Sequence, residues 1–255
     1  MKTMTSLAVY GMVALTAVTA QNTTGVQQAV VLEPQLVADQ IRSVVTDIGV
    51  DGAKCGMLAT AEMVRTVAAM IREFDIPNLV VDPVMVAKSG DFLLEPEARS
   101  ALCQELLPLA TVITPNLHET EALLKWRRKT ISTVEHMKEA ARSLHQLGPS
   151  WVVVKGGHLP GDAVDIAYDG QDFLEMRSPR LKTPNTHGTG CTYSAALVSG
   201  LAQGLPVRQA LEKAKEYITW AIRHSLSLGS GHGPTNHFFH LRNLFEQPSE
   251  EVQKV

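Results

Sequence analysis

Apolar and polar positions follow two different periods along this chain. Short apolar runs at Gly11–Thr19, Leu79–Val84 and Trp151–Lys155 predict buried strands. Longer segments between them place apolar residues every three or four positions, which predicts helices. Five such helices are expected, over Pro34–Thr46, Thr60–Phe74, Pro96–Leu107, Gly188–Gln203 and Val207–Leu226. The alternation predicts an α/β fold with a mostly parallel central sheet and helices on both faces.

Local signals mark where some of these elements begin and end. Pro34 and Pro96 each follow an acidic residue and suit the first turn of a helix, where a proline costs no hydrogen bond. Ser132 and Glu135 form a capping-box pattern ahead of a further helix. That helix is expected to stop at the Gly-Pro pair at 148–149.

A hairpin is expected over Val164–Met176, with its turn at Asp169-Gly170. The chain contains no internal repeat, low-complexity tract or linker. Its 255 residues, 45% of them hydrophobic, are enough to bury one sizeable core. We therefore expect a single domain over residues 1–255.

Charge and cysteine content narrow the class of protein. A formal charge of -3 and a pI near 6.3 provide no general attraction to nucleic acid or to an anionic membrane, so neither is an expected partner. The three cysteines, Cys55, Cys103 and Cys191, are odd in number and lack the spacing of metal ligands. They predict reduced thiols in a cytoplasmic protein.

The start of the chain resembles a secretory signal. Lys2 precedes an apolar run from Leu7 to Val18, which ends in small residues up to Ala20. Cleavage after Ala20 would remove the first predicted strand. No later run is apolar and long enough to span a bilayer.

The segment Asn185–Thr192 carries the strongest chemical signal. Gly188 and Gly190 leave the backbone bare at the start of a helix, where amide groups and the positive end of the helix dipole bind anions. Cys191 would lie in the first turn of that helix, an environment that favours a thiolate and lets it accept a proton. The alternative is an ordinary helix start that carries a small buried cysteine.

Most of the further candidates fall at strand ends, where open α/β sheets place their sites. Asp82 could bind Mg²⁺ through water or cap a turn, and Glu119 after Asn116 could serve a metal or simply the first turn of a helix. Lys155, followed by two glycines, combines a point charge with a backbone open to phosphates. Its alternative is a surface lysine beside a glycine turn.

Taken together, the motifs resemble those of the bacterial hydroxymethylpyrimidine and phosphomethylpyrimidine kinases of thiamine biosynthesis, in the ribokinase-like superfamily. The likeness runs almost from end to end. It rests on Tyr10-Gly11-Met12, Thr19-Ala20-Gln21-Asn22, Lys54-Cys55-Gly56-Met57-Leu58, Asp82-Pro83-Val84-Met85, Lys88-Ser89-Gly90, Thr114-Pro115-Asn116-Leu117-His118-Glu119, Val154-Lys155-Gly156-Gly157-His158, the Cys191 turn and Gly233-Pro234-Thr235-Asn236-His237.

The resemblance implies a role for each candidate residue. Cys191 would accept the proton of the substrate hydroxymethyl group. Most ribokinase relatives have Asp at this position, so the cysteine resembles the pattern of the branch that acts on pyrimidines and pyridoxal. The cofactors implied are ATP and Mg²⁺. The implied assignments are Gly188, Thr189 and Gly190 for the transferring phosphoryl group; Lys155, Asn116 and Thr186 for ATP phosphates; Asp82 and Glu119 for Mg²⁺; Gln21 and Met57 for the pyrimidine.

The family pattern also bears on the start of the chain. Because Tyr10 to Asn22 matches a core strand and a substrate loop of the family, we reject the signal peptide. Relatives carry a first strand, a glycine-rich turn and a substrate-binding Asp before the segment that corresponds to Met1–Met4. We expect that an internal methionine was taken as the start, which a native mass above 27.7 kDa would support.

Two other functions stay open. A pyridoxine or pyridoxal kinase would use the same turn on another hydroxymethylated ring, and a chain without the first strand could be a catalytically impaired protein that binds nucleotide or pyrimidine. The expected partner is a small pyrimidine, and the resemblance implies a homodimer.

Overall fold

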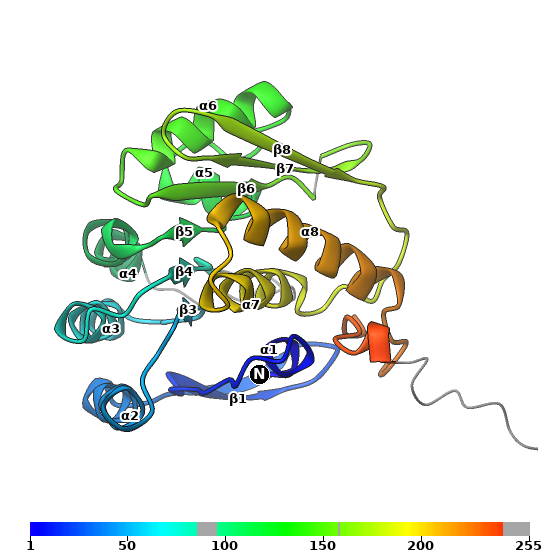
Figure 1. Cartoon of the computed structure of the whole chain (residues 1–255). Coiled ribbons are helices and arrows are strands. Elements are labelled where there is room, and N and C mark those ends of the chain that lie inside the picture. Colours follow the sequence, from blue (N-terminus) through cyan, green and yellow to red (C-terminus); the bar gives the residue numbers. More distant parts are fainter. Residues whose placement is uncertain (86–95, 158, 242–255) are drawn as a thin grey trace, which may run out of the picture.

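The computed structural model describes residues 1–85, 96–157 and 159–241 (Figure 1). Its main sheet has the strand order β3-β4-β5-β6-β7-β8, in which β3 to β6 are parallel and β7 and β8 are antiparallel to their neighbours. Lys88-Ser89-Gly90 and His158 lie outside the described residues. The strands are β3 (Ala53–Cys55), β4 (Leu79–Val81), β5 (Val112–Ile113), β6 (Trp151–Lys155), β7 (Ala163–Tyr168) and β8 (Phe173–Ser178).

Helices cover both faces of this sheet, as the hydrophobic pattern predicts (Figure 1). α7 and α8 pack together on one face, and α1 lies against α7. The other face carries α3, α4, α5 and α6, with α2 beside α3. The helices are α1 (Lys2–Ser6), α2 (Pro34–Asp47), α3 (Ala61–Glu73), α4 (Pro96–Ala101), α5 (Leu117–Leu123), α6 (Val134–His145), α7 (Thr189–Ala202) and α8 (Val207–Arg223).

The core consists of two layers, one on each face of the sheet. In β6, Val153 packs with the α7 and α8 layer, whereas Val152 and Val154 pack with the layer on the other face. Both kinds of position are fully buried, which explains why the strand has an unbroken apolar sequence. Burial of a valine side chain contributes roughly 1.5–3 kcal/mol.

The strand expected over Gly11–Thr19 is wrong. The strand here is β1 (Ala17–Gln21), which pairs only with β2 (Val26–Val31) in a separate two-stranded antiparallel sheet. Leu15 lies before it, and its backbone N–H and C=O pair with the side chain of Gln40, at 2.9 and 3.1 Å. A side-chain amide of α2 thus occupies the place of a neighbouring strand, and the segment is not core.

The hairpin expected at Asp169-Gly170 is confirmed as β7 and β8. The helix expected over Pro96–Leu107 is less regular: α4 continues into a π-helical turn, Leu102–Leu106, and a 3₁₀ turn, Leu107–Leu109. In the part of the chain that the structure describes, no helix combines the length and the apolar character needed to cross a bilayer.

The capping box expected at Ser132 and Glu135 is also wrong. The N-cap of α6 is Thr133, whose side chain accepts a hydrogen bond from the backbone N–H of His136 at 3.2 Å. Both serine and threonine are good N-caps, so the local sequence alone did not decide between the two positions.

Replacement of Thr133 with Ala should lower the free energy of unfolding by about 1 kcal/mol, because it leaves the first amides of α6 without their side-chain acceptor. Ser132→Ala is the matched control and should have a smaller effect. Urea denaturation of both variants measures the difference. A larger loss for Ser132→Ala would contradict the observed cap.

Candidate active site

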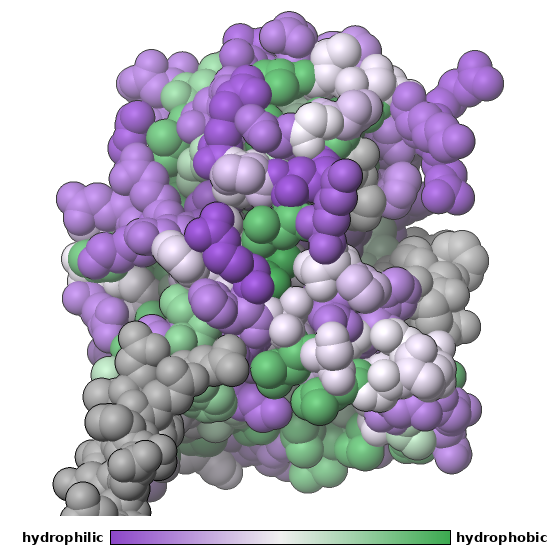
Figure 2. Space-filling view, turned by 90° about the vertical axis from the view of Figure 1, so that its right-hand side faces the viewer, coloured by the Kyte–Doolittle hydropathy of each residue, from purple (hydrophilic) through white to green (hydrophobic). Residues whose placement is uncertain are grey.

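The parallel strands β3, β4, β5 and β6 bring their carboxyl ends to one edge of the sheet. Asp82 follows β4, Asn116 follows β5, and Lys155 ends β6. The chain leaves β6 toward the right-hand side of Figure 1, and Figure 2 shows that side. Hydrophilic surface predominates in the upper half of Figure 2, and hydrophobic surface gathers in the centre and below it. The strand order thus places Asp82, Asn116 and Lys155, all predicted from the sequence, at one edge of the sheet.

Asp82 and Lys155 form a buried ion pair at this edge. Lys155 Nζ donates to Asp82 Oδ1 at 2.9 Å, and the two side chains are 16% and 2% exposed. Burial alone would raise the pKa of the Asp82 carboxyl, but the charges of Lys155 and Lys54 hold that pKa below its usual value. Burial likewise opposes the charge of Lys155, yet Asp82 and Glu119 raise its pKa. Both groups are therefore charged at neutral pH.

Asn116 and Glu119 form a complete capping box at the start of α5. Asn116 Oδ1 accepts from the N–H of Glu119 at 3.0 Å, and Glu119 Oε2 accepts from the N–H of Asn116 at 2.7 Å. Capping by Glu119 is thus observed, and a role of Glu119 in binding Mg²⁺ stays a prediction. Burial raises the pKa of Glu119 to about 7, with Lys155 lowering it and Asp82 raising it. Its carboxyl group therefore lies within electrostatic range of the ion pair, and a bound cation would favour its ionised form.

The Cys191 turn is placed directly over this pair. Gly188 has φ +77° and precedes α7, a left-handed conformation that favours glycine. A Cβ on Gly190 would lie 3.3 Å from Lys155 Nζ and 3.4 Å from Asp82 Oδ2, so only glycine gives this close approach without displacement. Cys191 is exposed. Gly190 therefore brings the start of α7 against the ion pair, and the catalytic role of the neighbouring Cys191 stays a prediction.

A distant segment supports the turn from behind. His187 pairs with Pro234 in a parallel bridge, and its N–H donates to the carbonyl of Gly233 at 3.0 Å. Thr192 Oγ1 and Thr235 Oγ1 are 3.2 Å apart. The Gly-Pro-Thr motif therefore positions the Cys191 turn.

Two hydroxyl groups that were not expected from the sequence hold Asp82. Thr114 Oγ1 donates to Asp82 Oδ1 at 3.1 Å, and Ser194 Oγ donates to Asp82 Oδ2 at 3.3 Å. Ser194 is fully buried in α7, but so are Thr192 and Ser199 of the same helix. Nothing in the sequence of this helix therefore distinguished Ser194 as the partner of Asp82.

A second buried ion pair was also missed. Lys215 Nζ of α8 donates to Asp165 Oδ2 of β7 at 2.7 Å, and Asp165 Oδ1 accepts from the N–H of Gly156 at 3.0 Å. Gly156 follows Lys155, so this pair anchors the glycine turn beside the cation. A charged residue inside the apolar strand Ala163–Tyr168 was its only signal in the sequence.

Comparison with known proteins assigns the family. A family model described as phosphomethylpyrimidine kinase matches residues 1–236. This chain belongs to the phosphomethylpyrimidine kinase family. The hydroxymethylpyrimidine/phosphomethylpyrimidine kinase of Streptomyces coelicolor is 48% identical over 237 residues, covering 93% of this chain and 87% of that protein. The thiamine biosynthesis bifunctional protein of Geobacter sulfurreducens is 50% identical over 238 residues, 93% of this chain but only 48% of that protein.

Solved structures agree with this family. The crystal structure of an ADP complex of Bacillus subtilis pyridoxal kinase is similar with a TM-score of 0.84 and 40% sequence identity, covering 92% of this chain and 89% of that one. The likeness confirms the ribokinase-like fold expected from the sequence. It also shows that phosphomethylpyrimidine kinases and pyridoxal kinases share one architecture, so the fold does not separate the two activities.

The two residues predicted to bind substrate occupy different surroundings. Met57 is half-buried just beyond β3, at the same edge as Asp82, and its carbonyl accepts from Thr16 Oγ1 at 2.9 Å. Gln21 is exposed at the end of β1. Thr16 thus links the segment that leads into β1 to the edge of the main sheet. Substrate binding by Gln21 and Met57 stays a prediction.

The pair of carboxylates fits the way this family would use Mg²⁺. In the described residues no group of three metal-ligating side chains occurs. Mg²⁺ usually keeps several waters and binds through one or two carboxylates together with substrate phosphates. Asp82 and Glu119, which both act electrostatically on Lys155, are the carboxylates that would hold Mg²⁺ in that way together with substrate phosphates.

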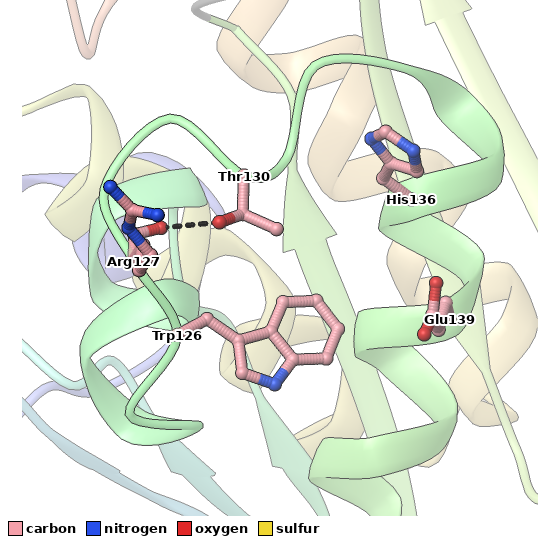
Figure 3. Close-up of a pocket in the computed structure, with 5 residues that line it drawn as sticks. All are labelled: Trp126, Arg127, Thr130, His136 and Glu139. Carbon is pink, nitrogen blue, oxygen red and sulfur yellow. Dashed lines mark hydrogen bonds between the residues drawn. The ribbon is translucent and has the colours of Figure 1, made fainter.

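A cavity away from this edge contains none of the predicted site residues. Figure 3 shows the indole of Trp126 between the loop after α5 and helix α6, and the space has a volume of about 340 Å³. Its other lining residues are Arg127, Thr130, His136 and Glu139. The predicted site residues thus lie at the edge of the sheet and not in this cavity.

Proposed function

We propose that this chain transfers the γ-phosphoryl group of MgATP to the hydroxymethyl group of 4-amino-5-hydroxymethyl-2-methylpyrimidine and then to the resulting monophosphate. The observation that carries this proposal is the start of α7, where Gly190 approaches the buried Lys155–Asp82 pair and the adjacent Cys191 is exposed. A proton acceptor, an anion-binding turn and a fixed cation are the groups that phosphoryl transfer to an alcohol requires.

In the first transfer, the Cys191 thiolate accepts the proton of the alcohol while the alcohol oxygen attacks the γ-phosphorus. A new O–P bond forms, the bond to the bridging oxygen breaks, and ADP leaves. Amides of Gly188, Thr189 and Gly190 face the transferring group, where they stabilise the charge that develops on it. This arrangement follows from the helix start that Gly188 forms.

Lys155, Asn116 and Thr186 are proposed to hold the ATP phosphates, with Asp82 and Glu119 holding Mg²⁺. Mg²⁺ would neutralise charge on the phosphates. Gly157 contributes an open backbone, since a Cβ there would have no atom within 4 Å. Gln21 would pair with the aminopyrimidine edge, and Met57 would pack against the ring.

The test is ADP release from MgATP with hydroxymethylpyrimidine and pyridoxine offered separately. Turnover with the pyrimidine supports the proposal. Turnover with pyridoxine alone would replace it with pyridoxal kinase activity, in line with the similarity to the Bacillus subtilis enzyme. A shift in melting temperature on ligand addition without turnover would identify an impaired binding protein.

We further propose that the chain acts as one domain in a cytoplasmic homodimer, joined through the sheet of β1 and β2. Val18 and Val30 pair across this sheet and are 54% and 52% exposed. Further apolar side chains are exposed nearby along the chain: Tyr10, Val13, Leu15, Val31 and Leu36. An exposed apolar surface of this kind is typical of an interface between subunits.

Replacement of both Val18 and Val30 with Asp should therefore convert the dimer to a monomer. Each subunit would contribute two carboxylates, so the interface would bury four negative charges without partners. Light scattering after size-exclusion chromatography measures the change. Lys213→Asp is the control, since Lys213 is exposed on α8 and is not part of the β1–β2 sheet. A mass unaffected by the double substitution would exclude this interface.

A further inference from the structure

Lys54 is a second cation at the active-site edge that the mechanism above does not use. It lies in the middle of β3, and its side chain is half-buried. Lys155 is committed to Asp82, but Lys54 forms no ion pair with any residue in the described ranges 1–85, 96–157 and 159–241. A half-buried ammonium group without a carboxylate partner in an otherwise paired site is available to an anionic ligand.

The register of the sheet places Lys54 on the same face as the Cys191 turn. Lys54 pairs with Val80 in the parallel strand β4, and paired residues point to the same face. Val80 packs in the layer that contains α7, and Asp82, two residues further on, meets Ser194 of α7. Lys54 therefore emerges on the α7 side of the sheet.

The side chain of Lys54 then follows its strand toward the active-site edge. Its Nζ lies 2.7 Å from the position that a Cβ on Gly56 would occupy, so the absence of a side chain at Gly56 makes room for the ammonium group. The charge of Lys54 helps to lower the pKa of Asp82. The pKa of the Met1 amino group is lowered, mainly by burial. Lys54 also lowers this pKa, whereas Cys191 raises it. Lys54 thus shares one region with both Asp82 and Cys191.

The two transfers make different demands on these residues. In the first transfer the attacking alcohol must lose a proton, which Cys191 accepts. In the second transfer the attacking oxygen belongs to a phosphate monoester, which carries a charge of about -1.5 to -2 at pH 7 and needs little help from a base. That phosphate must instead approach the anionic γ-phosphoryl group, and an added cation offsets the repulsion between them.

We propose that Lys54 binds the phosphate already present on the monophosphate substrate and so determines the efficiency of the second transfer. This inference rests on the proposed function. A monophosphate oxygen attacks the γ-phosphorus, a P–O–P bond forms, and ADP leaves. Lys54 acts as a point charge on the phosphate.

The experiment compares Lys54→Gln and Lys54→Arg, with the alcohol and the monophosphate as separate substrates. For Lys54→Gln, kcat/KM with the monophosphate should fall by about 10- to 150-fold, the effect of one hydrogen bond to a charged group. The alcohol reaction should change far less. Lys54→Arg should keep most of the monophosphate reaction because it keeps the charge. Lys213→Gln, which removes an equal charge from an exposed position on α8, should leave both reactions unchanged.

Calorimetry of monophosphate binding without ATP separates this inference from the proposed function. Equal losses with both substrates, or no loss with either, would overturn the role of Lys54. If the unmodified chain shows no turnover with either substrate, the proposed kinase function fails. Binding then decides about Lys54: weaker binding of the monophosphate to Lys54→Gln supports the site, and binding that does not depend on Lys54, or is absent, overturns it.

Discussion

Replacement of Cys191 with Ala should lower kcat for the alcohol by about 10²- to 10⁴-fold, the usual contribution of a positioned proton acceptor. KM for both substrates should change little, because the amides of the turn and Lys155 remain. Stability should change by less than about 0.5 kcal/mol, since Cys191 is exposed and lies outside the core. Steady-state ADP release and urea denaturation measure the two effects.

Two controls make the result for Cys191 specific. Cys191→Asp should recover part of the rate, because a carboxylate at this position is again a proton acceptor. Iodoacetamide should modify Cys191 first and abolish turnover, since burial raises the pKa of Cys55 to about 11 and also raises the pKa of Cys103. A Cys191→Ala variant with undiminished kcat would remove the thiol from the mechanism.

Replacement of Lys155 with Met should lower the free energy of unfolding by roughly 3–5 kcal/mol at pH 7.5, because it leaves the buried carboxylate of Asp82 without its closest cation. Turnover should also be lost, since the same ammonium group is proposed to hold ATP phosphates. Asp82→Asn combined with Lys155→Met removes both charges and should be more stable than Lys155→Met alone. Urea denaturation at constant salt measures the free energy of unfolding of the unmodified chain, of Lys155→Met and of the double variant.

The pH dependence of this loss has a definite sign. In the unmodified protein the pKa of Asp82 is lowered, so its contribution is present above the unfolded value of about 3.9 and is lost as the pH falls through its folded value. In Lys155→Met, burial without Lys155 should raise the folded pKa of Asp82 instead. The variant should therefore lose less stability at pH 5 than at pH 7.5. An equal deficit at both pH values would show that lost packing, and not charge, is responsible.

Much of the candidate site was predictable because its signals are local. Asp82, Asn116 and Lys155 each follow an apolar strand, and parallel strands necessarily align their carboxyl ends. Gly188 and Cys191 lie within a few residues of each other at a helix start, so local sequence is enough to predict this turn. The same holds for α3, whose cap at Thr60 agrees with the predicted range.

Pairs that join distant segments were not predictable, because no periodicity connects their members. Asp165 and Lys215 lie on a strand and a helix that meet only after folding. The apolar neighbours of Asp165 mark it as unusual, but they do not indicate Lys215 as its partner. The cap of α6 depended on which of two adjacent hydroxyl groups faced the helix, and the structure selected Thr133.

The sequence by itself determined the α/β alternation, the ribokinase-like family and the composition of the Cys191 turn, because strand and helix periods and short motifs are properties of neighbouring residues. Only the tertiary structure decided that residues 11–16 form no strand, that Ser194 and Thr114 hold Asp82, and that Lys54 lies on the α7 side of the sheet. Each of those outcomes depends on a hydrogen-bond partner or a strand register that lies far away along the chain, and it therefore exists only once the sheet has formed.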